Sequence, residues 1–96
     1  MRMKVHMRGG DILVAACDEP LLGRMLKEGE LRLDVSNEFY GGDSGGEDML
    51  LSRLKAATMA NLVGEEACRV AAEHGYIDTE RLITIEGVPH AQMVRY

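Results

Sequence analysis

The side chains in this sequence best suited to recognising a ligand fall into three short segments. Phe39 and Tyr40 lie in a glycine-rich stretch, Asn61 lies within a helix-like run, and His90 and Gln92 lie near the end of the chain. Aromatic rings stack on unpaired bases, and amide and imidazole groups bond base edges. His90 and Gln92 share a side if the backbone is extended. These five residues predict an RNA-binding surface, provided that the fold brings them together.

Each of these residues also has a structural interpretation. Phe39, the only Phe of the chain, can fold inward with Tyr40 as a loop anchor, because burying an aromatic side chain stabilises a fold by about 1.5–3 kcal/mol. Asn61 can close a corner between two helices by bonding backbone groups. On general preferences alone, these structural roles are the commoner outcome.

Acid–base catalysis is a weaker interpretation. His6 and His90 titrate near neutral pH, but no acid or nucleophile stands beside either in the sequence. We expect His6 on the exposed polar face of a strand. An enzyme that uses His90 or His6 would need a carboxylate or nucleophile within about 3 Å of the ring, so we predict no catalytic residue.

The cysteines and glycines indicate no cofactor or metal. Cys17 and Cys68 lie far apart, without a CxxC motif or a histidine at ligand spacing, so we expect two small core hydrophobes in a reducing compartment. The glycines at 41–42 and 45–46 lack the GxxxxGK[ST] pattern of a phosphate-binding loop. This excludes nucleotide binding of that type.

Length and charge limit the class of protein. With 96 residues, 46% of them hydrophobic and 28% charged, the chain fits one globular domain, residues 1–96. A net charge of -5 disfavours a broad phosphate-binding surface, although Arg2, Lys4, Arg8 and Arg95 can form a local basic patch if the first and last segments pair. The acidic excess can instead serve solubility. Since no apolar run reaches the ~18 residues that span a bilayer, we expect a cytoplasmic protein without a membrane partner.

Alternating or β-rich segments predict the strands. Residues 3–7 alternate and residues 12–17 are wholly apolar, so we expect a hairpin in which 12–17 is central. The alternation over 30–35 predicts a half-buried strand, and 82–86 predicts another. Pro89 cannot donate a ladder hydrogen bond, so the last segment, 90–96, is expected at an edge or as a bulged crossing.

Helical spacing marks two other regions. Asp18 is placed to cap a short helix that ends at Gly29. Residues 47–75 have apolar side chains three and four apart, interrupted at Asn61 and Gly64, which predicts two helices joined by a tight corner. The stretch 36–46 has no apolar period and is expected to be a loop. The predicted fold is therefore α+β, a two-layer α/β sandwich of order ββαβααββ, with a mainly antiparallel sheet of four or five strands and helices on one face.

Four motifs resemble one known family. They are Leu22-Gly23, Phe39-Tyr40-Gly41-Gly42, Ala57-Thr58-Met59-Ala60-Asn61-Leu62-Val63-Gly64 and Gly87-Val88-Pro89-His90-Ala91-Gln92. In this order and spacing they resemble the archaeal family called domain of unknown function four-two-four, over almost the whole chain. The resemblance implies an archaeal cytoplasmic protein with a compact two-layer α/β fold. It implies no activity and therefore no catalytic residues.

The sequence leaves three functions open. The first is a noncatalytic binding module for RNA or a ribonucleoprotein, with Phe39, Tyr40, Asn61, His90 and Gln92 as its surface. The second is a protein-interaction or dimerisation domain, in which a sheet edge or a Met-rich surface, implied by seven Met residues, recruits another chain. The third is a small enzyme that uses His90 or His6.

Overall fold

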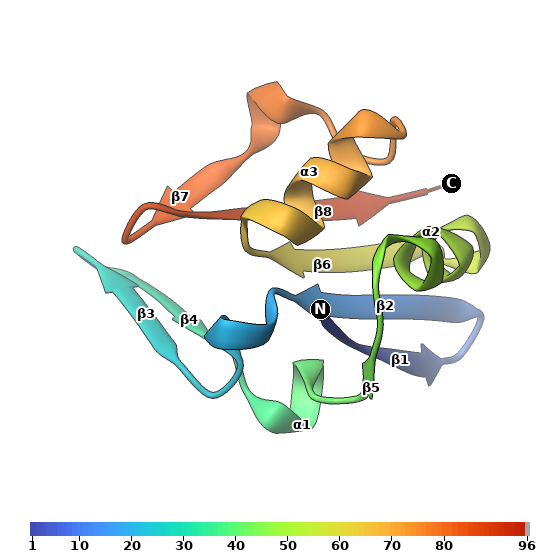
Figure 1. Cartoon of the computed structure of the whole chain (residues 1–96), viewed down its shortest axis with the longest axis horizontal. Helices are drawn as coiled ribbons and strands as arrows, with labels where there is room; N and C mark the ends of the chain where they lie inside the picture. The colour runs from blue at the N-terminus through green and yellow to red at the C-terminus, as the bar shows by residue number, and fades with distance from the viewer. Residues whose placement is uncertain (96) are drawn as a thin grey trace.

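The computed structural model describes residues 1–95, which form a mixed α and β fold (Figure 1). The elements in chain order are β1 (Arg2–Arg8), β2 (Asp11–Cys17), the 3₁₀ turn η1 (Glu19–Leu21), β3 (Met25–Glu28), β4 (Leu31–Asp34), α1 (Asn37–Tyr40), β5 (Asp43–Ser44), α2 (Glu47–Ala56), β6 (Met59–Val63), α3 (Glu65–Glu73), the 3₁₀ turn η2 (Thr79–Arg81), β7 (Ile83–Ile85) and β8 (Val88–Val94). None of the helices in this part of the chain is long and apolar enough to cross a membrane.

Six strands form the main sheet, in the order β5-β1-β2-β6-β8-β7. All neighbours are antiparallel except β2 and β6, which run parallel. Strands β3 and β4 form a separate hairpin. The predicted α+β class and mainly antiparallel sheet are confirmed, whereas the predicted four or five strands and the order ββαβααββ are wrong.

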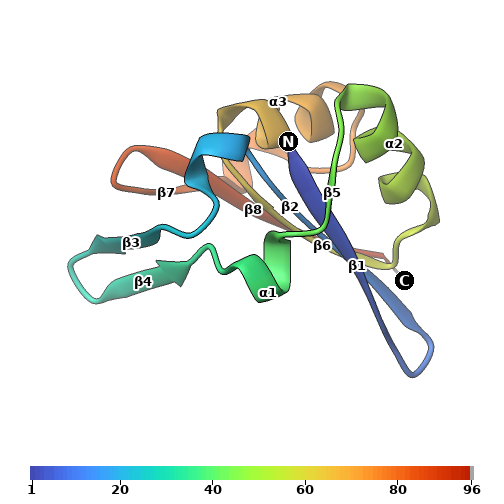
Figure 2. The ribbon, with the colours of Figure 1, turned by 60° about the horizontal axis from the view of Figure 1, so that its bottom comes forward.

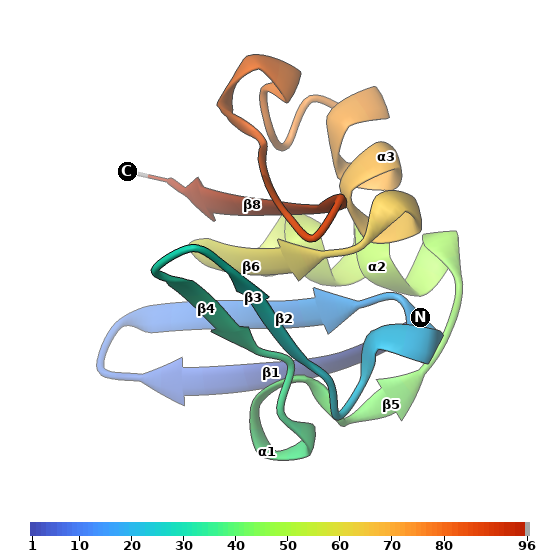
Figure 3. The same ribbon diagram turned by 90° about the vertical axis from the view of Figure 1, so that its left-hand side faces the viewer.

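Different elements cover the two faces of the main sheet, and one face is covered only in part. Figure 2 shows α2 and α3 on one face and the β3–β4 hairpin with α1 on the other. The helix-side core contains the fully buried Leu50, Leu54, Leu62 and Val70. A second apolar cluster lies under the hairpin, which crosses the sheet obliquely (Figure 3). The two-layer prediction therefore missed a partial third layer.

The central strand β6 replaces the predicted helix corner. Met59–Val63 pairs with β2 on one side and β8 on the other, so Asn61 does not close a corner and shares no helix face with Thr58. Ala60 and Leu62 point to the helix-side core, while Asn61 and Val63 point to the opposite face. Pairing on both sides overrides the helix-compatible composition of this segment.

The predicted short helix after Asp18 is also wrong. Only the turn η1 forms there, and the chain continues into β3. The Asp18 carboxylate instead accepts hydrogen bonds from the backbone N–H groups of Glu66 (3.0 Å) and Ala67 (2.9 Å), at the start of α3. Gly64 lies against this carboxylate and has a φ of 114°, a combination that leaves no room for a side chain.

The remaining predictions hold in part. The β1–β2 hairpin and the strands at 31–34 and 83–85 are confirmed, but 36–46 contains α1 and the two-residue strand β5. The last strand begins at Val88 and lies between β6 and β7, so it is not an edge along its whole length. Pro89 is tolerated because it lies beyond the end of β6, where only its carbonyl is used, by the N–H of Gly64 at 2.8 Å. Residue 96, the end of the strand predicted at 90–96, lies outside the described residues.

Candidate functional site

Three of the five candidate residues lie together on the face of the sheet opposite α2 and α3. Asn61 on β6 is directly opposite Gln92 on β8, and His90 is two residues along the same strand, opposite Val63. Directly opposite residues of an antiparallel pair have Cβ atoms about 4.5–5.5 Å apart. Two amides and an imidazole are therefore neighbours, which no feature of the sequence around Asn61 indicated.

Apolar side chains of the same face adjoin this group. The cross-strand register aligns Leu13, Met59 and Val94 in the row next to Asn61 and Gln92. Val94 is 53% exposed, and Leu13 and Met59 are half-buried. We call the following six residues the open sheet surface: Leu13, Met59, Asn61, His90, Gln92 and Val94.

A backbone hydrogen bond fixes the orientation of His90. Its Nδ1 lies 3.0 Å from the carbonyl oxygen of Leu62. A carbonyl only accepts, so Nδ1 carries the hydrogen and Nε2 of the neutral ring is an acceptor. The ring can thus accept a hydrogen bond from an amide or an amino group.

The aromatic pair has divided roles. Tyr40 is only 3% exposed and belongs to the core under the β3–β4 hairpin, where burial raises the pKa of its phenol to about 12. It is an anchor and cannot stack on a ligand in this structure. Phe39 is half-buried and stacks on His6, with the ring centroids 4.7 Å apart and the planes inclined by 18°. The predicted platform of two aromatic rings is therefore not formed.

His6 belongs to this aromatic contact rather than to an exposed polar face. It is half-buried, and its Nε2 donates to the carbonyl oxygen of Phe39 at 2.8 Å. It lines a hollow of about 420 Å³ with Arg8, Asp11 and others, but Asp11 instead accepts from the hydroxyl of Thr58 at 3.3 Å. Within residues 1–95, the hydrogen bonds of both candidate histidines go to backbone carbonyls, so neither forms an acid–base pair.

The cysteines behave as the sequence predicts for small core hydrophobes. Cys17 is fully buried and Cys68 is 2% exposed, and both are free thiols. Burial raises the pKa of Cys17 to about 11 and that of Cys68 to about 12. The part of the chain that the structure describes contains no group of three His, Cys, Asp or Glu placed to hold a metal ion.

Basic side chains of β1 lie on the same face as the open sheet surface. Arg2 is paired with Glu19 at 3.4 Å, and the Nζ of Lys4 donates to the carbonyl of Glu38 at 2.9 Å. Arg8 is exposed at the end of the strand. The predicted basic patch required the first and last segments to pair, but β1 pairs with β2 and β5, and β8 pairs with β6 and β7, so the patch of four is not formed. Arg95 turns to the other face and lies over the ring of Tyr76 at 5.0 Å.

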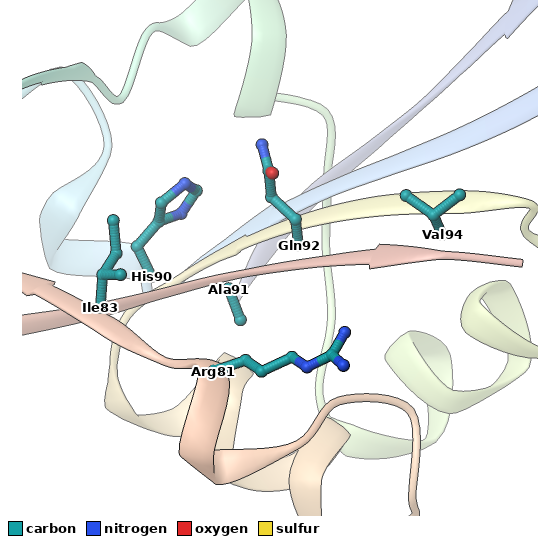
Figure 4. A pocket seen from close by; sticks show the side chains of 6 residues that line it. All are labelled: Arg81, Ile83, His90, Ala91, Gln92 and Val94. Carbon is teal, nitrogen blue, oxygen red and sulfur yellow. The ribbon is translucent and has the colours of Figure 1, made fainter.

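A hollow of about 540 Å³ opens where β7 ends beside β8 (Figure 4). Ile83, His90, Gln92 and Val94 lie on one side of β8 in this view, and Arg81 extends from η2 alongside the strand. Sequence reasoning missed Arg81 because a single basic residue before a strand gives no local signal. It missed Leu13 and Met59 because their exposure depends on how much of this face the β3–β4 hairpin covers.

Comparison with known proteins gives the family. A family model described as "Protein of unknown function (DUF424)" matches residues 6–96. The crystal structure of an uncharacterized conserved protein from Methanopyrus kandleri superposes with a TM-score of 0.80 at 30% sequence identity, covering 99% of this chain and 93% of that one. No curated protein matches the chain. Since the family model covers nearly the whole sequence, as the motifs predicted, this protein belongs to the DUF424 family of proteins of unknown function.

Proposed function

We propose that this protein is a noncatalytic binding module that holds a short single-stranded segment of RNA, free or in a ribonucleoprotein, on the open sheet surface. The main support is the convergence of Asn61, Gln92 and His90 on one accessible face. Amide groups bond base edges through paired donors and acceptors, and sequence-specific RNA recognition uses unpaired bases of this kind.

Apolar and basic neighbours complete the proposed surface. The base faces contact Leu13, Met59 and Val94, which lie in one row across the sheet. Arg8 and Arg81, at opposite ends of the face, bind phosphates. Because these cations are few and the net charge is -5, we expect binding to depend on base contacts more than on charge.

The setting of this function is also a proposal. An archaeal source accords with the structural neighbour from Methanopyrus kandleri, an archaeon. A cytoplasmic location accords with free, buried cysteines, which suit a reducing compartment.

The test is RNA binding by amide variants. The probe is a pool of short unstructured RNA oligonucleotides, measured by fluorescence anisotropy. Asn61→Ala with Gln92→Ala should weaken binding about 5- to 150-fold, since a good bidentate base contact contributes about 1–3 kcal/mol. The matched control is Asn37→Ala, the third amide of the chain, which lies exposed on α1. Equal affinity of the double variant and the wild type, or no RNA binding by the wild type, would refute the proposal.

The phosphate contacts have a separate readout. Replacing both Arg8 and Arg81 with Ala should reduce the slope of log affinity against log salt concentration by about 1.4, because each phosphate contact with a single strand contributes about 0.7 to this slope. Arg24→Ala removes a comparably exposed arginine beside β3 and should leave the slope unchanged.

A further inference from the structure

The outer edge of β8 is an unpaired strand edge. The carbonyl of Pro89 accepts from Gly64, and the N–H of Arg95 donates to Thr58, so the backbone groups of odd-numbered residues point to β6. The register with β6 is unbroken from His90 to Val94. Backbone groups of successive residues in a strand alternate in direction, and those of Gln92 and Val94 therefore point away from β6.

No strand lies opposite these two residues in the described part of the chain. β7 is three residues long, and its pairing with β8 ends at Ile83 opposite His90. The chain before it turns away into η2 (Figure 1). Gln92 and Val94 thus present N–H and C=O groups in the position where a longer β7 would pair with them.

Space for an additional strand is present on both sides of this edge. The hollow of about 540 Å³ lies toward Ile83 and His90, and a second of about 140 Å³ lies toward Tyr76 and Met93. Both are lined by the same four residues: Arg81, Ala91, Gln92 and Val94. The two hollows adjoin the edge in line with β7.

At Gln92 and Val94 the edge also lacks the usual protection against strand addition, because Pro89 of β8 lies where β7 still pairs with the strand. Charged side chains, Lys above all, protect exposed edges from pairing with other chains. β1, at the other side of the sheet, contains Arg2, Lys4 and Arg8. β8, by contrast, reads VPHAQMV and contains no Lys, Arg, Asp or Glu.

Charge indicates the kind of segment that fits. Arg81 is exposed, lines both hollows, and makes no ion pair within residues 1–95. The acidic residue that lines the smaller hollow, Asp78, accepts from the N–H of Glu80 at 3.0 Å and caps η2. The free edge of β1 is basic and does not complement Arg81, so the β1 edge of a second copy is a poorer fit than an acidic segment.

We propose that the β8 edge at Gln92 and Val94 binds an extended peptide of another protein, which adds a strand antiparallel to β8 in line with β7 and places an acidic side chain against Arg81. Main-chain hydrogen bonds supply the affinity in this mode of recognition, and pockets for alternate side chains supply the specificity. This surface overlaps the proposed RNA surface at Arg81, Gln92 and Val94, but it uses the backbone groups of the strand edge rather than the side chains of the sheet face.

The experiment starts with selection from a phage-displayed peptide library on the purified protein. We expect peptides that alternate β-branched and acidic residues, and the strongest is then synthesised as the probe. Hydrogen exchange followed by NMR should show fast exchange at the Gln92 and Val94 amides in the free protein and protection when the peptide is bound. The amides of Ala91 and Met93, which face β6, should be protected in both states.

Variants test the same contact by affinity. Val94→Pro removes an outward N–H without touching the bonds to β6 and should weaken peptide binding about tenfold, whereas Val94→Ala should change it less than twofold. Arg81→Glu should also cost about tenfold, and Arg24→Glu should not.

Three results would overturn the proposal. The first is a selection without acidic β-type peptides, the second is a bound peptide that leaves the Gln92 and Val94 amides unprotected, and the third is protection of these amides by the RNA pool instead of the peptide. Loss of RNA binding in the amide variants, with peptide binding retained, would leave both proposals standing as separate activities.

Discussion

Removal of the Asp18 carboxylate should destabilise the protein, because this carboxylate accepts a hydrogen bond at the start of α3, from a residue 48 positions further along the sequence. The N-cap residue of α3 is Gly64, which has no side chain to cap the helix. Asp18 performs this role from the end of β2, through bonds of 3.0 and 2.9 Å to the N–H groups of Glu66 and Ala67. Asp18→Ala leaves both groups without this acceptor.

The magnitude follows from two contributions. Replacing an N-cap by Ala costs about 0.5–2 kcal/mol, and an anion in the first turn adds about 0.3–1 kcal/mol through the helix dipole. Because two N–H groups lose their partner, we expect a loss of about 2 kcal/mol in the free energy of unfolding. For a domain of this size, that lowers Tm by about 8–16 °C.

Chemical and thermal unfolding followed by circular dichroism measures this loss. Asp18→Asn keeps an acceptor without the charge and should lose about half as much. Asp34→Ala, an exposed aspartate on β4, is the matched control and should change stability by less than about 0.5 kcal/mol. If Asp18→Ala stays within that same limit, the long-range cap contributes nothing and the reasoning is wrong.

Three further predictions concern the core around this cap. Gly64→Ala should lower the free energy of unfolding by at least about 2 kcal/mol, because the φ of Gly64 is positive and a Cβ would overlap the Asp18 carboxylate. This loss should be smaller in the Asp18→Ala background, as a double-mutant cycle measured by urea unfolding would show. Cys17 and Cys68 should react with a thiol reagent at neutral pH only as the protein unfolds, at a rate that follows urea concentration, and rapid labelling of the folded protein would contradict their burial. Folding raises the pKa of these thiols from 9.0 to about 11 and about 12, so their neutral form is favoured in the folded state. Their contribution to stability should be constant below pH 9 and lost as pH rises toward 12, a decline that Cys17→Ala with Cys68→Ala should reduce in denaturation curves at alkaline pH.

The extent to which the fold was predictable depends on how local the determining contacts are. The β1–β2 hairpin follows from an alternating segment, an apolar segment and a short turn between them, and α2 begins at residue 47, the start of the predicted helical stretch. The strands at 82–86 and 90–96 were predicted separately, but their pairing as a hairpin was not. β6 was missed because Met, Ala, Asn and Leu suit a helix, and its strand form comes from neighbours distant in sequence.

The segment after Asp18 shows the same limit. Leu21, Leu22, Met25 and Leu26 are spaced as on a helix, yet Leu21 and Leu26 are buried against the sheet from a 3₁₀ turn and a strand. Aspartate is a common helix cap, and Asp18 does cap a helix, but that helix is α3 and not the one predicted to follow Asp18. Residue type indicated the role, and only the tertiary structure identified the partner.

The candidate site divides in the same way. His90 and Gln92 lie on one side of a strand, as their spacing predicted. Asn61 joins them only because β6 pairs with β8, while Tyr40 leaves the group because the β3–β4 hairpin covers it. Alternation determines which residues share a face, but exposure depends on what packs above them.

The parallel pairing of β2 with β6 has a consequence for how the sheet assembles. On one side of this seam, β1 and β2 are joined by a two-residue turn, and on the other, β7 and β8 form a second local hairpin. The seam itself pairs residue 13 with residue 59 and requires closure of the whole intervening chain. Loop closure over that distance must precede any gain from the pairing. The two hairpins should therefore form early, and the long-range pairing of β2 with β6 should set the rate at which the molecule folds.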